Sequence, residues 1–195
     1  GGEWVECAVF FSDVAGFTSI SESLKPEELV ELLNEYLTAM TDIILEEEGT
    51  VDKFEGDAII AFWNAPLEQS DHAARAVRAA LACQAKLAEM RPDIHARVGK
   101  ELFMRIGLNS GPAVVGNMGS RTRFDYTMLG DAVNLAARLE GTNKQFRTYS
   151  MVSATTRAPR SPSGSVPLIV KRTRSGSSQS KTFPTLSVDT PISMG

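Results

Sequence analysis

The prediction of the fold begins at residues 7–18, which read CAVFFSDVAGFT. A short apolar run bounded by turn residues is typical of a buried strand. The run ends within two residues at Asp13, and a glycine, an aromatic residue and a hydroxyl follow at positions 16–18. We therefore predict a buried strand over residues 6–12 that carries a carboxylate to its end and then turns tightly.

Working outward, hydrophobic periodicity and turn residues predict the remaining helices and strands. Their order is strand, helix, hairpin, helix, hairpin, helix, strand. This order predicts an α+β domain with a mostly antiparallel sheet and helices on one face. The predicted elements are a helix from Pro26 towards the stop at Gly49, a hairpin of residues 50–54 and 58–62, a helix over 71–90, strands over 103–108 and 113–115 joined by a turn at 109–112, a helix over 131–141, and a strand over 148–152.

The composition is that of a soluble globular protein. The chain has 195 residues, of which 43% are hydrophobic and 23% charged, and these are ordinary values. The apolar run Ala58–Trp63 is far shorter than a membrane span. Cys7 and Cys83 are expected to be reduced core residues, because no disulfide framework surrounds them. We expect a cytoplasmic domain.

The charge is divided unevenly and suggests two regions. Residues 1–156 carry 14 basic and 23 acidic residues, a net of −9, whereas residues 157–195 carry 6 basic and 1 acidic residue, a net of +5. The second region is rich in Ser and Pro and reads as a disordered or aberrant tail. The acidic first region argues against nucleic acid as a partner.

Two acids at strand ends are candidates for binding a cation. Asp13 alone is consistent with a helix N-cap, but Asp57 also occupies a tight turn, in FEGDAII. Carboxylates from neighbouring strands that converge would suit Mg²⁺, which prefers oxygen ligands and substrate phosphates. The backbone from Val14 to Thr18 opens a helix and is a candidate anion site, with Gly16 allowing close approach.

A second cluster, FDYTMLGDAVNLAARLE, covers residues 124–140. Asn134 and Arg138 are four residues apart and therefore share one face of the predicted helix. They are either a surface hydrogen-bonded pair or a phosphate-directed pair, since Arg suits phosphate. Thr127 is either an exposed turn hydroxyl or part of the same site.

Four motifs in order make the chain resemble the class III nucleotidyl cyclase catalytic domain, of the bacterial adenylyl cyclase type. No single motif is decisive, but together they are highly specific and cover roughly residues 5–156. The resemblance implies a ferredoxin-like βαββαβ-type fold, in a catalytic domain over residues 1–156. The motifs are FFSDVAGFT at 10–18, VDKFEGDAIIAFW at 51–63, IGLNSGPAVVGNMGS at 106–120 and YTMLGDAVNLAARLE at 126–140.

The resemblance assigns roles to these residues. Asp13 and Asp57 match the metal-binding aspartates, for two Mg²⁺ or Mn²⁺ ions per active site, with the Val14 carbonyl as a further ligand. Lys53 and Thr127 match the adenine-selective pair. The substrate would also meet Gly16, Phe17 and Thr18, while Asn134 matches the ribose-positioning asparagine and Arg138 the transition-state arginine.

The implied reaction is the conversion of ATP to 3′,5′-cyclic AMP and pyrophosphate. In the family, the active site is shared across a head-to-tail homodimer, so a lone subunit is expected to be inactive. Arg121 and Arg123 lie in a loop expected near the triphosphate, and either is a candidate for phosphate binding or for a solvated loop charge. The resemblance leaves room for an upstream regulatory or membrane domain in the full-length protein.

The end of the sequence departs from the family. Members usually continue with a strand pair that bears a triphosphate-gripping lysine, and residues 157–195 show no such pattern. Lys171 and Lys181 are weak substitutes. We therefore expect the usual C-terminal strands to be lacking.

Three other functions are kept as alternatives. A guanylyl or mixed-specificity cyclase is disfavoured by Lys53, because guanine N1 carries a proton and would meet a donor with a donor. A catalytically weak or inactive nucleotide-binding dimerisation module is favoured by the unusual tail. A diguanylate cyclase is disfavoured because the hairpin reads FEGDA at its turn rather than GGDEF.

Overall fold

The computed structural model describes residues 2–156, so the predictions for residues 157–195, Lys171 and Lys181 included, lie outside the described residues. The α+β prediction is confirmed. The elements are β1 (Glu3–Val14), α1 (Phe17–Ser21), α2 (Pro26–Glu46), β2 (Thr50–Glu55), β3 (Ala58–Trp63), α3 (His72–Val98), β4 (Met104–Gly119), β5 (Phe124–Leu129), α4 (Asp131–Phe146) and β6 (Ser150–Val152).

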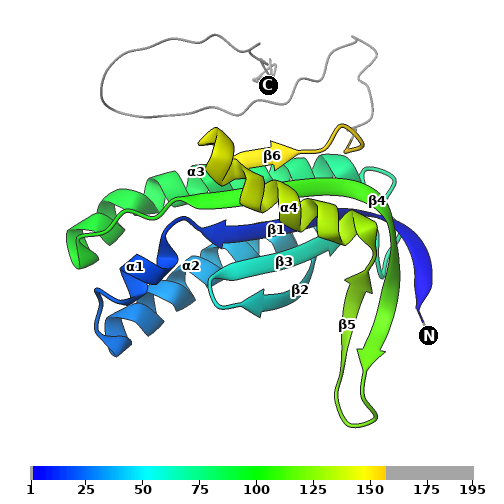
Figure 1. Ribbon diagram of the computed structural model, residues 1–195, viewed down its shortest axis with the longest axis horizontal. Helices are drawn as coiled ribbons and strands as arrows, with labels where there is room; N and C mark the ends of the chain where they lie inside the picture. The colour runs from blue at the N-terminus through cyan, green and yellow to red at the C-terminus, as the bar shows by residue number, and fades with distance from the viewer. Residues whose placement is uncertain (1, 157–195) are drawn as a thin grey trace, which may run out of the picture.

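The sheet has the strand order β2-β3-β1-β4-β5, and β6 pairs with β4 (Figure 1). All neighbours in this order are antiparallel, whereas the β4–β6 pair is parallel. The helices cover both faces, because α2 and α3 pack on one and α4 on the other. The expectation of helices on one face was therefore wrong.

The central strand β1 explains why both faces are covered. Ala8, Phe10 and Val14 are buried in the core under α2 and α3, while Cys7 and Val9 are buried in the core that includes Ala136 of α4. A continuous apolar run is typical of a strand that is buried on both faces. Since side chains alternate along a strand, Asp13 belongs to the face on which α4 lies.

The predicted turn at residues 109–112 was wrong, because β4 runs through it without interruption. Asn109 is a residue type common in turns, but its side chain forms hydrogen bonds to other elements of the fold. Its amide Nδ2 donates to the Ala132 carbonyl at 2.9 Å, and its Oδ1 accepts from Thr155 Oγ1 at 3.0 Å. Tertiary hydrogen bonds thus replace the local ones that favour a turn.

Pro112 is tolerated inside β4 because of what lies on the strand's other edge. Among residues 2–156, β6 pairs with β4 only at residues 106–108, and β5 begins to pair at Val114. Pro112 therefore faces β1 on one edge and no strand on the other, so its missing N–H costs no ladder bond there.

Two further boundaries differ from the prediction. Strand β5 was not predicted, since most of its side chains are exposed and it lacks an alternating buried face. Helix α3 continues past residue 90 and through Pro92. Its extension is held by the fully buried Ile94 and by an ion pair from Arg97 to Glu35 of α2.

The two cysteines are free and buried, as predicted. Burial raises the pKa of each thiol to about 12, so both are protonated at neutral pH.

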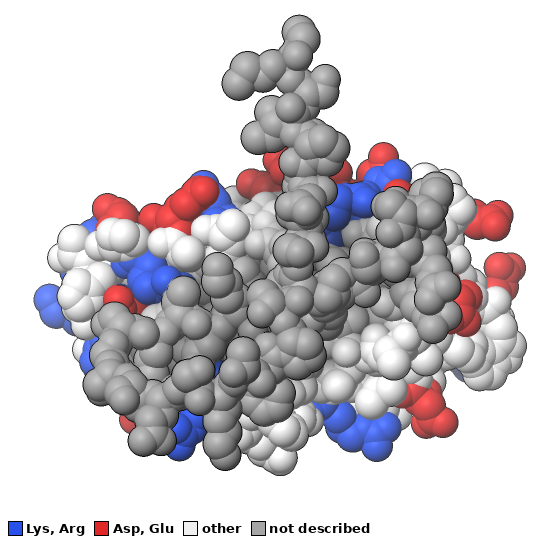
Figure 2. Space-filling view, turned by 90° about the horizontal axis from the view of Figure 1, so that it is seen from above, with Lys and Arg blue, Asp and Glu red and all other residues white. Residues whose placement is uncertain are grey.

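No helix of residues 2–156 is long and apolar enough to cross a membrane. On the visible part of one face, acidic and basic side chains are interspersed (Figure 2).

Helix α4 lies directly on β4 at Gly107. A Cβ at this position would lie 2.2 Å from the Ala136 carbonyl oxygen and 2.3 Å from the Glu140 nitrogen. Since both are backbone atoms, a methyl group can be fitted only by moving α4 away from the sheet.

We predict that Gly107→Ala lowers the free energy of unfolding by about 3 kcal/mol or more, because overpacking displaces a whole helix. Gly141→Ala is the matched control. It lies in α4 with nothing within 4 Å of the new Cβ, so it should stabilise the domain by about 0.5–1 kcal/mol. Urea unfolding measures both, and equal effects would contradict the packing described for α4.

Candidate active site

Asp13 and Asp57 come together at the end of β1. Asp13 is the penultimate residue of that strand, and Asp57 lies in the turn between β2 and β3. The backbone N–H of Val14 donates to Asp57 Oδ2 at 2.7 Å. This bond fixes the second carboxylate beside the residue that follows the first, so the structure brings the two predicted aspartates together.

Arg105 of β4 is placed directly opposite Asp13 in the sheet register. Its Nε and Nη2 donate to the two carboxylate oxygens of Asp13 at 3.0 and 2.7 Å, a bidentate pair. The same Nε also lies 3.0 Å from Glu140 Oε1 of α4. The Arg105 side chain is 10% exposed, so one buried cation holds two carboxylates.

The local charge favours a bound cation. Burial first, and then the neighbouring Asp13 carboxylate, raise the pKa of Glu140 to about 7. Burial also raises the pKa of Asp57, with Asp13 adding to the effect. Both shifts reflect burial of the carboxyl groups first and the nearby Asp13 second, and Arg105 supplies one positive charge for these three acids.

The donor set fits a hard divalent ion. Residues 2–156 contain no group of three or more His, Cys, Asp or Glu side chains arranged to hold a metal by themselves. Two carboxylates with backbone oxygen nearby match Mg²⁺, which is usually held by one or two carboxylates together with substrate phosphates. Asp13, Asp57 and the Val14 carbonyl are therefore the residues that would hold such an ion.

The loop after β1 turns at Gly16, which has a φ of +72°. A side chain rarely adopts this conformation, and a Cβ here would meet nothing within 4 Å, so the loop surface is open. The short helix α1 begins at Phe17, and Thr18 is exposed. The predicted backbone surface therefore lies next to the two aspartates.

Lys53 and Thr127 are brought together by a residue that the sequence analysis missed. Thr127 lies in β5 and is 8% exposed, so it is not the exposed turn hydroxyl of the simpler interpretation. Its Oγ1 donates to Asp52 Oδ2 at 2.6 Å, and Lys53 Nζ lies 3.6 Å from Asp52 Oδ1. The predicted pair converges on one carboxylate.

Asn134 and Arg138 are both exposed on α4, where their spacing of four places them on one face of the helix. Glu140, which contacts Arg105, follows Arg138 by two positions and is therefore about 200° away around the helix. Within residues 2–156, no side-chain hydrogen bond or ion pair joins Asn134 or Arg138 to either aspartate. In one chain these two residues thus face away from the carboxylates.

Arg121 and Arg123 are not brought to the aspartates of their own chain. They lie in the loop after β4, whereas Asp13 pairs with Arg105 near the start of β4. The 14 residue-to-residue steps from Arg105 to Gly119 correspond to roughly 45 Å of strand. Figure 1 shows the β4–β5 hairpin projecting away from the body.

Arg105, Glu140 and Asp52 are the site residues that sequence reasoning missed. A signal was present for Arg105, because it interrupts an apolar strand in FMRIGL, and a buried charge requires a partner. A weaker signal was present for Glu140, because it is a charged residue on a helix face that is otherwise apolar. Asp52 gave no such signal, because its placement depends on an irregularity in strand pairing.

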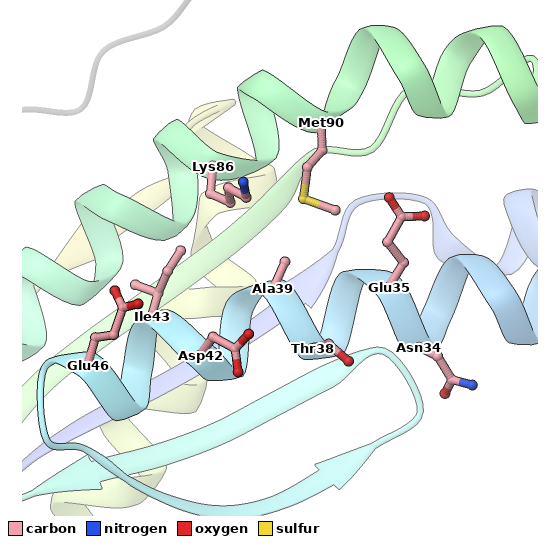
Figure 3. Close-up of a pocket in the computed structure, with 9 residues that line it drawn as sticks. All are labelled: Asn34, Glu35, Thr38, Ala39, Asp42, Ile43, Glu46, Lys86 and Met90. Atoms are coloured by element: carbon pink, nitrogen blue, oxygen red, sulfur yellow. The ribbon is translucent and has the colours of Figure 1, made fainter.

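A separate groove of about 730 Å³ lies between α2 and α3 (Figure 3). Met90 of α3 points towards α2. None of the predicted site residues lines this groove. Its lining consists of Asn34, Glu35, Thr38, Ala39, Asp42, Ile43, Glu46, Lys86 and Met90.

The class of this domain follows from a family match that covers most of the chain. Residues 3–161 match the family described as the adenylate and guanylate cyclase catalytic domain. This chain belongs to that family.

Similar proteins include cyclases of both nucleotide types. Adenylate cyclase 1 of Rhizobium meliloti is 40% identical over 148 residues, which are 76% of this chain and 22% of that protein. The adenylyl cyclase CyaB from P. aeruginosa is 41% identical, with a TM-score of 0.71 over 73% of this chain and 74% of that one. The guanylyl cyclase Cya2 is 40% identical, with a TM-score of 0.73 over 80% and 78%.

Two facts follow from these comparisons. The chain spans about a fifth of the length of the Rhizobium protein. An adenylyl and a guanylyl cyclase are similar to it to almost the same degree, so overall similarity does not decide the nucleotide.

We predict that Arg105→Met lowers the free energy of unfolding by about 2–4 kcal/mol, because it leaves Asp13 and Glu140 without their shared cation. Adding Glu140→Gln should restore part of the loss, since one carboxylate is neutralised. Arg97→Met is the control: Arg97 also pairs with several acids but is 36% exposed, so it should cost below about 1 kcal/mol. Chemical denaturation would disprove this account if the losses at Arg105 and Arg97 were equal.

Proposed function

We propose that this domain converts ATP to 3′,5′-cyclic AMP and pyrophosphate, at two sites shared by a head-to-tail homodimer. The observation that carries the proposal is the convergence of Asp13 and Asp57 at Val14, while Lys53 and Thr127 converge separately on Asp52. One chain would thus provide both a carboxylate pair for the metal ions and a pair that reads the base. The 3′-oxygen of the ribose would form a bond to the α-phosphorus as the bond to pyrophosphate breaks.

The carboxylate half would bind the triphosphate and its metal ions. Divalent ions, two per site of Mg²⁺ or Mn²⁺, would activate the 3′-hydroxyl and neutralise the triphosphate when bound at Asp13 and Asp57. The backbone at Gly16, Phe17 and Thr18 would face the phosphates from the open loop next to these aspartates.

The base-reading half would select adenine. The Lys53 ammonium is a donor and suits adenine N1, which is an acceptor, whereas guanine N1 carries a proton. Lys53 is partly exposed, with 41% of its side chain accessible, so a base could contact its ammonium while it stays beside Asp52. This residue is the reason to prefer ATP over GTP, despite the equal similarity to Cya2.

The remaining catalytic residues would act on the site of the partner subunit. Arg138 would stabilise charge on the α-phosphoryl group, and Asn134 would hold the ribose. Their position on the side of α4 away from Glu140 supports this division between chains. A C2 dimer places the same surface on both sides, and the exposed Phe124 and Leu129 of the projecting hairpin are available for it.

Arg121 and Arg123 would contact a triphosphate only from the partner subunit, because the aspartates of their own chain lie at the other end of β4.

Two alternative functions are retained. A guanylate cyclase is supported by the similarity to Cya2. A catalytically weak nucleotide-binding module is disfavoured, since every motif residue that can be placed is present.

We predict that the domain forms cyclic AMP from ATP with Mg²⁺ or Mn²⁺ at a kcat/KM at least about tenfold above that for GTP, as expected for a charge-assisted hydrogen bond to N1. Lys53→Met should remove most of this preference, whereas Lys86→Met, on α3 and outside the site, should leave it intact. Quantifying both cyclic products tests this. Preference for GTP in the unmodified domain would replace the assignment with a guanylate cyclase.

Complementation tests the shared site. Asp13→Ala and Arg138→Ala should each be inactive alone, the latter by about 10³-fold in kcat. Mixed after subunit exchange, they should recover about a quarter of the unmodified activity, because half of the dimers are mixed and each has one intact site. Absence of recovery, with mixed dimers demonstrated by tagged subunits, would refute the shared site.

A further inference from the structure

We infer that Asp52 is a positioning residue that orients Lys53 and the hydroxyl of Thr127, and thereby sets which purine the domain accepts. This inference rests on the proposed function, because it assigns the origin of base selectivity at the same site. It follows from the strand irregularity at Asp52, its burial, and the two groups that converge on it.

Asp52 is the extra residue of a β-bulge. In the pairing of β2 with β3, Val51 lies opposite Ala61 and Lys53 lies opposite Ile60, so Asp52 has no opposite residue. Bulges redirect side chains and are common beside active sites. Here the bulge allows the consecutive side chains of Asp52 and Lys53 to lie close to each other, although side chains normally alternate along a strand.

The Asp52 carboxylate is nearly enclosed, with 3% of its side chain exposed. Its Oδ2 accepts the Thr127 hydroxyl at 2.6 Å. Its Oδ1 has no hydrogen-bond partner among the described residues and lies 3.6 Å from Lys53 Nζ. A buried carboxylate with an unfilled acceptor favours a cation beside it, and the Lys53 ammonium is the cation that lies there.

The contact also joins the two ends of the sheet. Lys53 belongs to β2 and Thr127 to β5, which are the first and last strands in the sheet order. Strands β2 and β5 nevertheless contact each other, and the Asp52–Thr127 hydrogen bond lies between them. Among residues 2–156, no other side-chain hydrogen bond or ion pair links Thr127 to Asp52 or Lys53.

The chemical consequence concerns the direction of one hydrogen bond. A threonine hydroxyl can donate or accept, so Thr127 alone would tolerate either a 6-amino or a 6-oxo purine. An ionised carboxylate only accepts, so the Thr127 proton is committed to Asp52. The Thr127 oxygen then offers only lone pairs to a base, which suits the amino group of adenine and opposes the 6-oxygen of guanine.

The test compares ATP with two triphosphates that differ at purine position 6. Purine riboside triphosphate lacks the amino group, and inosine triphosphate carries an oxygen there. The unmodified domain should prefer ATP over purine riboside triphosphate by about tenfold in kcat/KM, the size expected for one hydrogen bond. In Asp52→Asn this ratio should fall to within about twofold, and use of inosine triphosphate should rise relative to ATP.

The reason is that the Asn amide has the shape of the carboxylate but can donate to the Thr127 oxygen, which frees the Thr127 proton to face the base. Asp125→Asn is the matched control, because Asp125 is an exposed carboxylate on the same strand as Thr127. It should retain the unmodified ratio. A merely structural role for Asp52 would lower activity with all three nucleotides equally.

Two results would overturn the inference. The first is an unchanged ratio in folded Asp52→Asn. The second result applies if Asp52→Asn does not fold. Thr127→Ser keeps the hydroxyl that donates to Asp52, so it should keep the preference for ATP. Loss of that preference in Thr127→Ser would overturn the inference. Displacement of a fluorescent ATP analogue measures the preference among the three nucleotides as a ratio of binding affinities, without any turnover. If the domain forms no cyclic product, the proposed function fails, but this binding assay still tests the role of Asp52.

Discussion

The salt bridge between Arg105 and Asp13 is the interaction on which the rest of the site depends. It joins β1 to β4 at the end of the sheet and, through Glu140, ties both strands to α4. The planar guanidinium of Arg105 presents several donors at fixed angles, so it holds these two partly buried acids in fixed places. The site is therefore ordered by the chain itself, and its excess of carboxylates is what makes it suitable for a divalent ion.

A buried carboxylate, Asp52, organises the other half of the site. In the first half one cation holds two acids, and in the second one acid holds two donors, in each case from elements far apart in the sequence. Helix α4 separates their roles, since Glu140 faces its own sheet while Arg138 faces outward. This arrangement gives a physical reason why one chain would carry all the residues of the reaction without completing a site.

The sequence was sufficient for the local features of the fold. The apolar run of β1, the hairpin around Asp57 and the period of α2 predicted those elements, and the pairing of Asp13 with Asp57 followed from them. Three features depended on long-range contacts and could not be predicted. Asn109 is held by α4 rather than in a turn, β5 has almost no buried face, and the bulge at Asp52 has no local signal.

The most direct test of the central claim, that two incomplete half-sites form an active site only in a dimer, is specific activity against protein concentration. Sedimentation of the same samples gives the dimer fraction. If the site is shared, cyclic AMP formation per subunit rises in proportion to the dimer fraction and vanishes on dilution to monomer. Constant activity per subunit across the transition would show that one chain completes the site alone, and the shared site would then be wrong.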